Sequence, residues 1–124
     1  GYAVDLVADR LLDHGIDHFL FEIGGEFRGE GCKPNGSPWW VELETARQKG
    51  DQGNHQTSPT IVAVCGLSVA SSGHQFHHAI LPNGEAISHL INAKTCSARV
   101  NEIACVSVFD RSCMLADGWA TALY

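Results

Sequence analysis

Basic residues are scarce in this chain. Its 124 residues include 8 Lys and Arg against 14 Asp and Glu, which gives a net charge of −6 at pH 7 with neutral histidine. Proteins that bind a nucleic-acid backbone usually carry a cluster of cationic side chains, and this sequence has none. We therefore expect no nucleic acid among its partners.

Long apolar runs are also missing. The longest spans residues 61–67, well below the ~18 residues of a transmembrane helix. The chain opens at Gly1 with neither Met nor the basic segment of a signal peptide, and it stops inside an apolar pattern at Tyr124. We expect a single domain over 1–124 that is the C-terminal fragment of a longer protein.

No cysteine pair has the Cys-x-x-Cys spacing of a zinc knuckle or a thioredoxin-type site. Their odd number favours free, mostly buried thiols and a reducing compartment. The histidine cluster over 74–78 has no carboxylate or cysteine at a helpful spacing. We interpret it as a polar edge before a hairpin, with a zinc or copper site as the alternative. The five cysteines are Cys32, Cys65, Cys96, Cys105 and Cys113.

Hydrophobic periodicity predicts an α+β fold with a mainly antiparallel sheet and helices at both ends of the chain. The first helix is expected over 4–12, with Asp5 on its polar outer face and Gly15 as its stop. The last is expected over 112–123, capped by Asp110 or Ser112. Strands are predicted over 18–23, 39–44, 60–65, 76–80, 86–91 and 104–109, with loops over 28–38 and 45–59 and a hairpin turn at 82–84.

The last predicted helix carries two oxygen ligands on one face. Asp117 and Thr121 are four residues apart, and their neighbours include Ala and Gly. A carboxylate and a hydroxyl suit Mg²⁺, which completes its shell with water and substrate phosphate. The alternative is a helix face on which both side chains simply meet solvent. Gly118 costs ~1 kcal/mol relative to Ala in a helix interior, which indicates that something packs closely there.

Three further features have weaker chemical meaning. His89 lies between Ile87 and Ile91 on one face of a predicted strand, as either a hydrogen-bonded structural residue or a general base. The glycine pair at 24–25, after a strand, would let a ligand approach the backbone. The Ser-Ser-Gly run at 71–73 has the composition of a nucleophile turn but lacks the strand–turn–helix context of one.

Taken in order, the segments resemble the ApbE family of flavin transferases, formerly called thiamine biosynthesis lipoproteins, which attach FMN from FAD to protein threonines. The resemblance runs through nearly the whole chain and is weakest over 44–59. The matching segments are Gly-Tyr-Ala-Val-Asp at 1–5, Gly-Gly-Glu at 24–26, Gly-Ser-Pro-Trp at 36–39, Ala-Ser-Ser-Gly at 70–73, Ser-His at 88–89 with Thr95, and Ala-Asp-Gly-Trp-Ala-Thr-Ala-Leu at 116–123.

The resemblance implies part of a T-fold-like domain and a transfer in which an acceptor threonine attacks the FMN phosphorus of FAD and AMP leaves. It implies Mg²⁺ held by Asp117 and Thr121, and His89 as the catalytic group that takes or orients the threonine proton. The implied partners are FAD and a threonine-containing acceptor flavoprotein. The resemblance assigns FAD binding to Gly1, Tyr2, Ala3, Gly24, Gly25, Glu26, Ser72, Gly73 and Thr95.

The chain departs from the family's Ser-His-Ile-Ile-Asp-Pro-x-Thr-Gly motif. Asn92-Ala93 replaces Asp-Pro, and Cys96 replaces the final Gly, so a carboxylate and a rigid proline are lost. The family also begins upstream of Gly1 with a Lys and further pocket residues, so we expect this chain alone to bind FAD weakly and transfer FMN poorly.

Two alternatives follow from the departures and from the chemistry. One is a flavin-binding module without catalysis, and the other is a pyrophosphatase that hydrolyses FAD to FMN and AMP. The resemblance implies a periplasmic protein attached to the inner membrane only through a lipid anchor upstream of this sequence. The free thiols favour the cytoplasm as the alternative.

Overall fold

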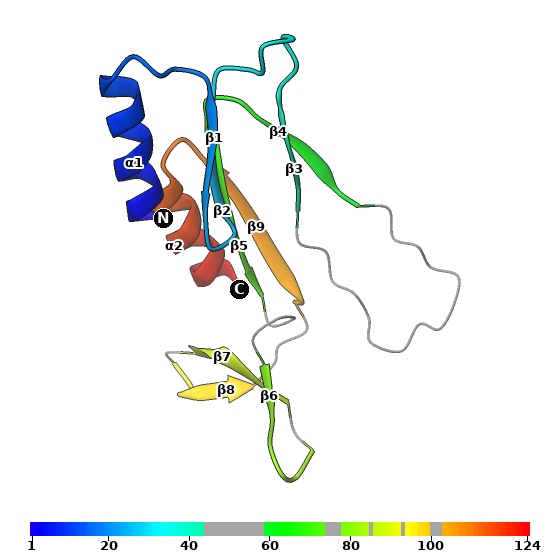
Figure 1. The fold of residues 1–124 in the computed structure, drawn as a ribbon. Helices are drawn as coiled ribbons and strands as arrows, with labels where there is room; N and C mark the ends of the chain where they lie inside the picture. Colours follow the sequence, from blue (N-terminus) through cyan, green and yellow to red (C-terminus); the bar gives the residue numbers. More distant parts are fainter. Residues whose placement is uncertain (44–58, 74–77, 85, 93, 100–102) are drawn as a thin grey trace.

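The structure, a computed structural model, describes the chain apart from residues 44–58, 74–77, 85, 93 and 100–102 (Figure 1). It confirms the predicted fold class, because its sheets are antiparallel and a helix lies at each end of the chain. In chain order the elements are α1 (Tyr2–Asp13), β1 (Phe19–Ile23), β2 (Glu26–Glu30), β3 (Trp39–Glu42), β4 (Ile61–Val64), β5 (Leu67–Gly73), β6 (His78–Ile80), β7 (Ala86–Asn92), β8 (Ser97–Arg99), β9 (Cys105–Asp110) and α2 (Cys113–Leu123).

The main sheet has four antiparallel strands in the order β1-β2-β5-β9. β1 and β2 form a hairpin in which Ile23 pairs with Glu26, so its loop is only Gly24 and Gly25. Both glycines have positive φ, +65° and +90°. A two-residue loop with two positive φ values is the turn that matches strand twist, and glycine adopts it without steric cost. The glycine pair therefore has a structural reason to be where it is.

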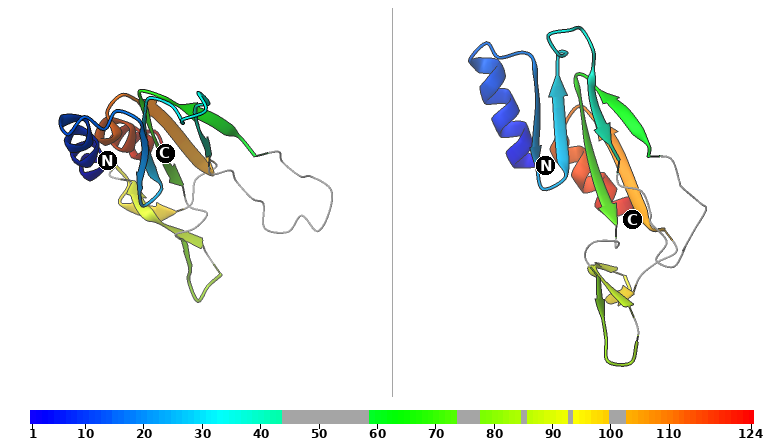
Figure 2. Two further views of the ribbon diagram at one scale, coloured as in Figure 1. Left: turned by 45° about the horizontal axis from the view of Figure 1, so that its top comes forward. Right: turned by 45° about the vertical axis from the view of Figure 1, so that its right-hand side comes forward.

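The two helices lie side by side on one face of this sheet (Figure 2). They contact it through small or β-branched residues, which allow the helix backbones to come close to the strands. The buried residues are Val4 and Ala8 of α1 and Cys113, Ala116 and Ala120 of α2. The first and last helices, from opposite ends of the chain, thus share one layer.

The opposite face of the sheet is covered by the two-stranded ribbon of β3 and β4. The hydrophobic core between the ribbon and the sheet consists of Val41 and Val64 from the ribbon and Val69 from β5, and all three are buried. Gly29 of β2 lies directly below β4, since a Cβ atom there would be 2.6 Å from the carbonyl oxygen of Val64. Ribbon and sheet are therefore in backbone contact at this point.

β6, β7 and β8 form a separate three-stranded sheet. The predicted hairpin is confirmed, with Ile80 paired to Ala86 and Gly84 at a φ of +82°. Asn92 accepts hydrogen bonds from the backbone N–H groups of Lys94 (2.9 Å) and Thr95 (3.2 Å) through its side-chain oxygen. Asn92 thus retains an acceptor where the family motif has Asp.

The helix limits agree with the pattern of the sequence. Gly15 stops α1, as predicted. The N–H of Gly15 donates to the carbonyl oxygen of Leu12 and the N–H of Ile16 donates to that of Leu11, which is the hydrogen-bond pattern of a Schellman cap. Ser112 is the N-cap of α2. Neither helix of the described residues has the length and apolar character needed to cross a membrane.

Several expectations are wrong. Residues 28–30 belong to β2 rather than to a loop, and β5, which contains the Ser-Ser-Gly run at 71–73, was not predicted. β8 was not expected. Asp5 is turned inward rather than outward. Of the free thiols only Cys113 is buried, while Cys65 and Cys96 are exposed and Cys32 is partly exposed, so the prediction of mostly buried thiols fails.

Candidate functional site

Four segments far apart in the sequence meet where α1 begins. The nitrogen of Gly1, which is the amino-terminal ammonium of this sequence, contacts the carboxylate of Glu26 at the start of β2 and lies 3.0 Å from Oδ2 of Asp117 on α2. One turn further along α2, the hydroxyl of Thr121 lies 3.1 Å from that of Ser72 near the end of β5. The structure thus brings together Gly1, Glu26, Ser72, Asp117 and Thr121.

The helical spacing explains how α2 presents its pair. Asp117 and Thr121 are one turn apart, so both side chains point along the same side of the helix. Ala116 and Ala120, one position earlier in each turn, are buried against the sheet. Asp117 therefore sits at the margin of the helix–sheet contact, and 42% of its side chain remains exposed to solvent.

The oxygen donors of this pair fit a hard cation only in part. The described residues contain no group of three or more His, Cys, Asp or Glu side chains able to hold a metal ion. Asp117 and Thr121 would therefore supply two ligands, and water and substrate phosphate would supply the others, as Mg²⁺ commonly accepts. Oδ2 of Asp117 and Oγ1 of Thr121 each have a further lone pair, beyond the hydrogen bond that they make now, which could bind the cation.

The other residues predicted to bind FAD lie around this cluster or apart from it. Tyr2 and Ala3 are exposed in the first turn of α1, Gly24 and Gly25 form the β1–β2 turn, and Gly73 ends β5. A cavity of about 220 Å³ reaches Gly25 from the ribbon side of the sheet. Its lining residues are Gly25, Phe27, Val41, Glu42, Leu43, Val69 and Ser71.

His89 and Thr95 belong to the three-stranded sheet. The backbone of His89 lies in β7 as predicted, and its side chain lies outside the described part of the structure. Thr95 is exposed in the turn between β7 and β8. The histidine cluster falls mainly on residues 74–77, which are outside the described residues, so the metal alternative there stays a hypothesis.

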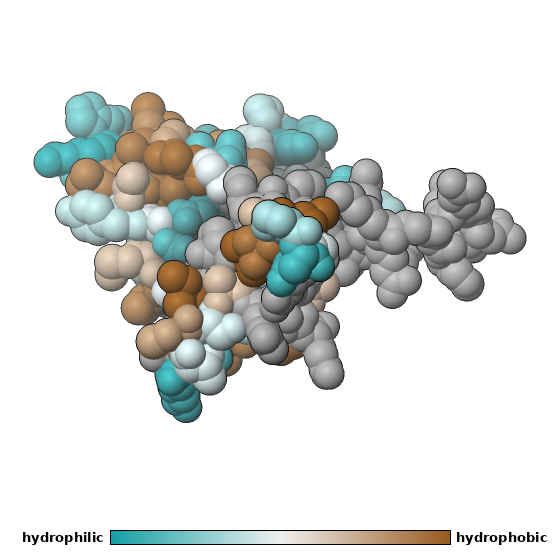
Figure 3. Space-filling view, turned by 90° about the horizontal axis from the view of Figure 1, so that it is seen from below, coloured by the Kyte–Doolittle hydropathy of each residue, from teal (hydrophilic) through white to brown (hydrophobic). Residues whose placement is uncertain are grey.

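Gly118 corrects one expectation about α2. Its Cβ position would face open space, with nothing within 4 Å among the described residues, so no close packing explains this glycine. The outer face of α2 is apolar instead, because Leu115, Trp119 and Leu123 repeat every four residues and are all exposed. Figure 3 shows apolar surface on the side of the molecule where the helices lie.

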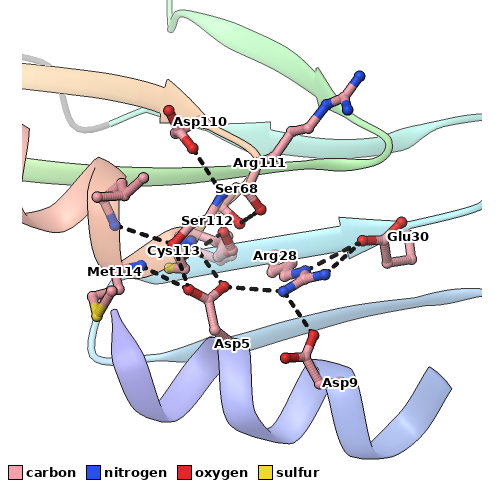
Figure 4. A network of polar contacts seen from close by, with 12 residues as sticks. Asp5, Asp9, Arg28, Glu30, Ser68, Asp110, Arg111, Ser112, Cys113 and Met114 are labelled. Carbon is pink, nitrogen blue, oxygen red and sulfur yellow. Dashed lines mark hydrogen bonds and ion pairs between the residues drawn. The ribbon is translucent and has the colours of Figure 1, made fainter. Parts of the chain in front are cut away.

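A polar network next to the cluster was missed by sequence reasoning (Figure 4). Arg28 of β2 donates to Asp5 (3.1 Å) and Asp9 (3.2 Å) of α1 and to Glu30 of β2 (3.2 Å). Asp5 in turn accepts hydrogen bonds from the start of α2. The sequence shows this network only as charged residues at every second position over 26–30. Their role becomes clear only once β2 and the helix that packs against it are known.

The network shifts the pKa values of its members. Burial works to raise the pKa of Asp5, but hydrogen bonds from Met114, Cys113, Ser112 and Arg28 outweigh it, so the pKa lies below its ordinary value. Burial likewise opposes the charge of Arg28, yet its hydrogen bonds to carboxylates leave its pKa raised. Both groups are therefore charged at neutral pH, and each charge of this partly buried pair is compensated by the other.

Comparison with known proteins places this geometry in a family. The sequence model of the ApbE family matches residues 1–124. The chain is 37% identical over 123 residues to the FAD:protein FMN transferase of Vibrio cholerae, which covers 99% of this chain and 35% of that protein. It is 29% identical over 124 residues to the protein of the same name from Haemophilus influenzae, with 100% and 34% covered.

Solved structures agree with the sequence comparison. The fold is similar to that of the apo form of the flavinyl transferase ApbE of Pseudomonas stutzeri, with a TM-score of 0.80 and 36% identity over 98% of this chain and 35% of that one. The flavin transferase ApbE of Vibrio cholerae gives a TM-score of 0.77 and 34% identity over 98% and 36%. The chain therefore spans about a third of the length of these relatives.

Proposed function

Because the chain belongs to the ApbE family, whose named relatives are flavin-transferring enzymes, we propose that it takes part in Mg²⁺-dependent transfer of FMN from FAD to a threonine of an acceptor protein, with release of AMP. One observation carries the proposal. Four separate segments of the family pattern contact one another around α2. Asp117 contacts Gly1, which also contacts Glu26, and one turn further along the helix Thr121 contacts Ser72.

The residues of the cluster have distinct roles in this proposal. Asp117 and Thr121 would hold Mg²⁺, which when bound neutralises charge on the pyrophosphate of FAD. The turn at Gly24 and Gly25 has no side chain, and nothing lies within 4 Å of either Cβ position, so a nucleotide can approach it. The N–H of Gly25 already donates to the carboxylate of Glu22 at 2.7 Å. Transfer reactions of phosphorus depend mainly on such positioning and charge neutralisation.

The bond changes balance without a further reactant. The hydroxyl oxygen of the acceptor threonine bonds to the phosphorus of the FMN half, and the bond from that phosphorus to the bridging oxygen breaks. AMP leaves with the bridging oxygen. His89 accepts the proton that the threonine hydroxyl loses, as an imidazole with a pKa near neutrality is suited to do.

Because residues 1–124 alone are expected to transfer FMN poorly, the test uses the protein at its full natural length, with FAD, MgCl₂ and an acceptor protein that carries the target threonine. Covalent flavin is detected by fluorescence of the denatured acceptor, and AMP by chromatography. We expect Asp117→Ala to lower transfer by on the order of 100-fold or more. Asp13→Ala, an exposed carboxylate on α1, is the matched control and should leave the rate unchanged.

Other outcomes identify the alternatives. Release of AMP without an acceptor would indicate a pyrophosphatase that uses water in place of threonine. Binding of FAD with no AMP under any condition would indicate a non-catalytic flavin-binding module. Equal transfer by Asp117→Ala and the unmodified chain would refute the metal assignment.

A further inference from the structure

The start of α2 is capped by a side chain from the other end of the chain. Asp5 Oδ1 accepts from the backbone N–H of Cys113 at 2.8 Å, and Oδ2 accepts from that of Met114 at 3.0 Å. The hydroxyl of Ser112 also donates to Oδ2, at 2.8 Å. α2 has no acidic residue in its own first turn, so the carboxylate that its N-terminus favours comes from α1.

A second contact ties the same two helix turns together. Gly1 lies so close to α2 that a Cβ atom on it would be 2.4 Å from Cα of Met114 and 2.6 Å from the carbonyl oxygen of Cys113. Gly1 and Asp5 are one helical turn apart, joined by the hydrogen bond from Asp5 N–H to Gly1 at 3.1 Å. The first turn of α1 therefore fits against the first turn of α2 at backbone distance.

Asp5 is itself fixed on its other side. Arg28 donates to Oδ1 at 3.1 Å, and only 14% of the Arg28 side chain is exposed. Because Arg28 belongs to β2, the carboxylate joins α1, α2 and the sheet in one arrangement (Figure 4). A carboxylate with partners on three elements has little freedom to move, and it therefore fixes the position of the first turn of α2.

We propose that Asp5 is a positioning residue, which holds the start of α2 so that Asp117 and Thr121 are presented together beside Gly1. This inference rests on the proposed function, since it concerns the pair assigned there to Mg²⁺. α2 is a continuous helix from Cys113 to Leu123, so a shift or tilt of its first turn carries over to Asp117, one turn on. Asp5 acts on the metal pair only through the helix.

A cap with a purely structural role would affect stability alone. The experiment therefore measures metal affinity at a temperature where each variant is fully folded, as judged by circular dichroism. Mn²⁺ replaces Mg²⁺ as the probe, in the presence of FAD, and free Mn²⁺ is read by electron paramagnetic resonance. The variants are made in the protein at its full natural length, and they are Asp5→Ala, Asp5→Asn, Asp9→Ala and Asp117→Ala.

Asp9 provides the matched control. Its carboxylate contacts the same Arg28 at 3.2 Å, but 64% of the side chain is exposed, and it lies one turn further along α1 from the start of α2. We expect Asp5→Ala to raise the dissociation constant for Mn²⁺ about tenfold, which is the low end of the effect of removing a group that orients metal ligands. Asp9→Ala should bind as the unmodified chain does.

Each outcome has one meaning. If the unmodified chain does not bind Mn²⁺, or binds it no better than Asp117→Ala, the proposed function fails. If Asp117→Ala loses binding but Asp5→Ala binds like Asp9→Ala, the positioning role is overturned while the function stands. If Asp5→Ala does not fold, Asp5→Asn decides, because its amide keeps one acceptor and places a donor against a backbone N–H. It should bind more weakly than Asp9→Ala, and equal binding overturns the proposal.

Discussion

Replacing Arg28 by Met is the sharpest test of what joins the helices to the sheet. The guanidinium contacts three carboxylates, those of Asp5, Asp9 and Glu30, at 3.1 to 3.2 Å. Met keeps an unbranched apolar stem but removes the charge and all donors. Asp5 and Glu30 would then lose their common partner in a region that is largely withdrawn from water, and Asp9 would lose its partner at an exposed position.

The exposed fraction of each carboxylate sets the magnitude. Asp9 is 64% exposed, so its pair contributes at most about 0.5 kcal/mol. Asp5 and Glu30 are 16% and 22% exposed, and a buried hydrogen bond to a charged group is worth about 1.5–3 kcal/mol, which we discount for screening to about 1 kcal/mol each. Asp5 keeps its partners on α2, so the loss stays near 2 kcal/mol, below the ~3–5 kcal/mol of a broken fully buried pair.

Urea unfolding followed by circular dichroism measures this loss directly. A change of that size corresponds to a fall in melting temperature of roughly 6–10 °C for a chain of this length. The matched control is Arg10→Met, since Arg10 is 72% exposed and pairs only loosely with Asp13 at 3.9 Å. We expect its effect to stay below about 0.5 kcal/mol.

Two results would refute the reasoning. One is a loss for Arg28→Met no larger than that for Arg10→Met. The other is a loss that disappears in about 1 M salt, because salt screens exposed charges far more than buried ones. A double-mutant cycle with Glu30→Gln adds a third check, with an expected coupling of about 0.5–3 kcal/mol for groups in direct contact.

Three further predictions follow from single residues. The pKa of Asp5 is lowered, against the opposing effect of burial, by hydrogen bonds from the start of α2. The stability that the ionised carboxylate contributes should therefore be complete above its ordinary pKa of 3.8 and should be lost as the pH falls through the lowered pKa. Acid unfolding of Asp5→Asn should not show this loss. Gly29→Ala should lower the free energy of unfolding by about 2 kcal/mol, because the added methyl group meets the backbone of β4. Gly118→Ala, whose methyl group faces open space on α2, should raise it by about 0.5–1 kcal/mol. Changes of the same sign in the two variants would contradict the packing described here. Burial raises the pKa of Cys113 to about 11, so at pH 8 a thiol reagent should label exposed Cys65 and spare Cys113, as mass spectrometry of the folded chain can check.

The helices were predictable because their information is local. Apolar spacing, the stop at Gly15 and the cap at Ser112 all lie within a few residues of the helix that they define. β2 was not predictable in the same way. Its charged residues at 26, 28 and 30 face the helices rather than solvent, and the charge of Arg28 is compensated by Asp5 from another element.

β5 was missed for a related reason. Ser68, Ala70 and Ser72 are small because α2 packs against them, not because the chain turns there. Such a strand lacks the large apolar residues that mark a buried strand in a sequence. Small polar residues under a helix and a charged strand beneath another helix both depend on contacts that local patterns do not contain.

The candidate site divides in the same way. The pair of Asp117 and Thr121 was visible from helical spacing alone, and the meeting of Gly1 with Asp117 had no local signal beyond the family pattern. The inward orientation of Asp5 was hidden because the sequence shows it among other acidic residues on α1. What sequence reasoning lacked at each point was the partner from a distant segment.

The distance in sequence between Asp5 and the start of α2 has a consequence for how this protein is made. The two are 108 residues apart at Cys113, and synthesis proceeds from the amino end. While the ribosome is still adding the middle of the chain, Asp5 and Gly1 have no partner helix, and neither Asp117 nor Thr121 exists. The contacts that join the two helices form only after the last helix has left the ribosome, and such long-range closure is slow compared with local folding. A polypeptide whose translation stops before α2 therefore lacks Asp117, Thr121 and every contact that they make, and retains only the contacts among the earlier segments, such as that of Gly1 with Glu26.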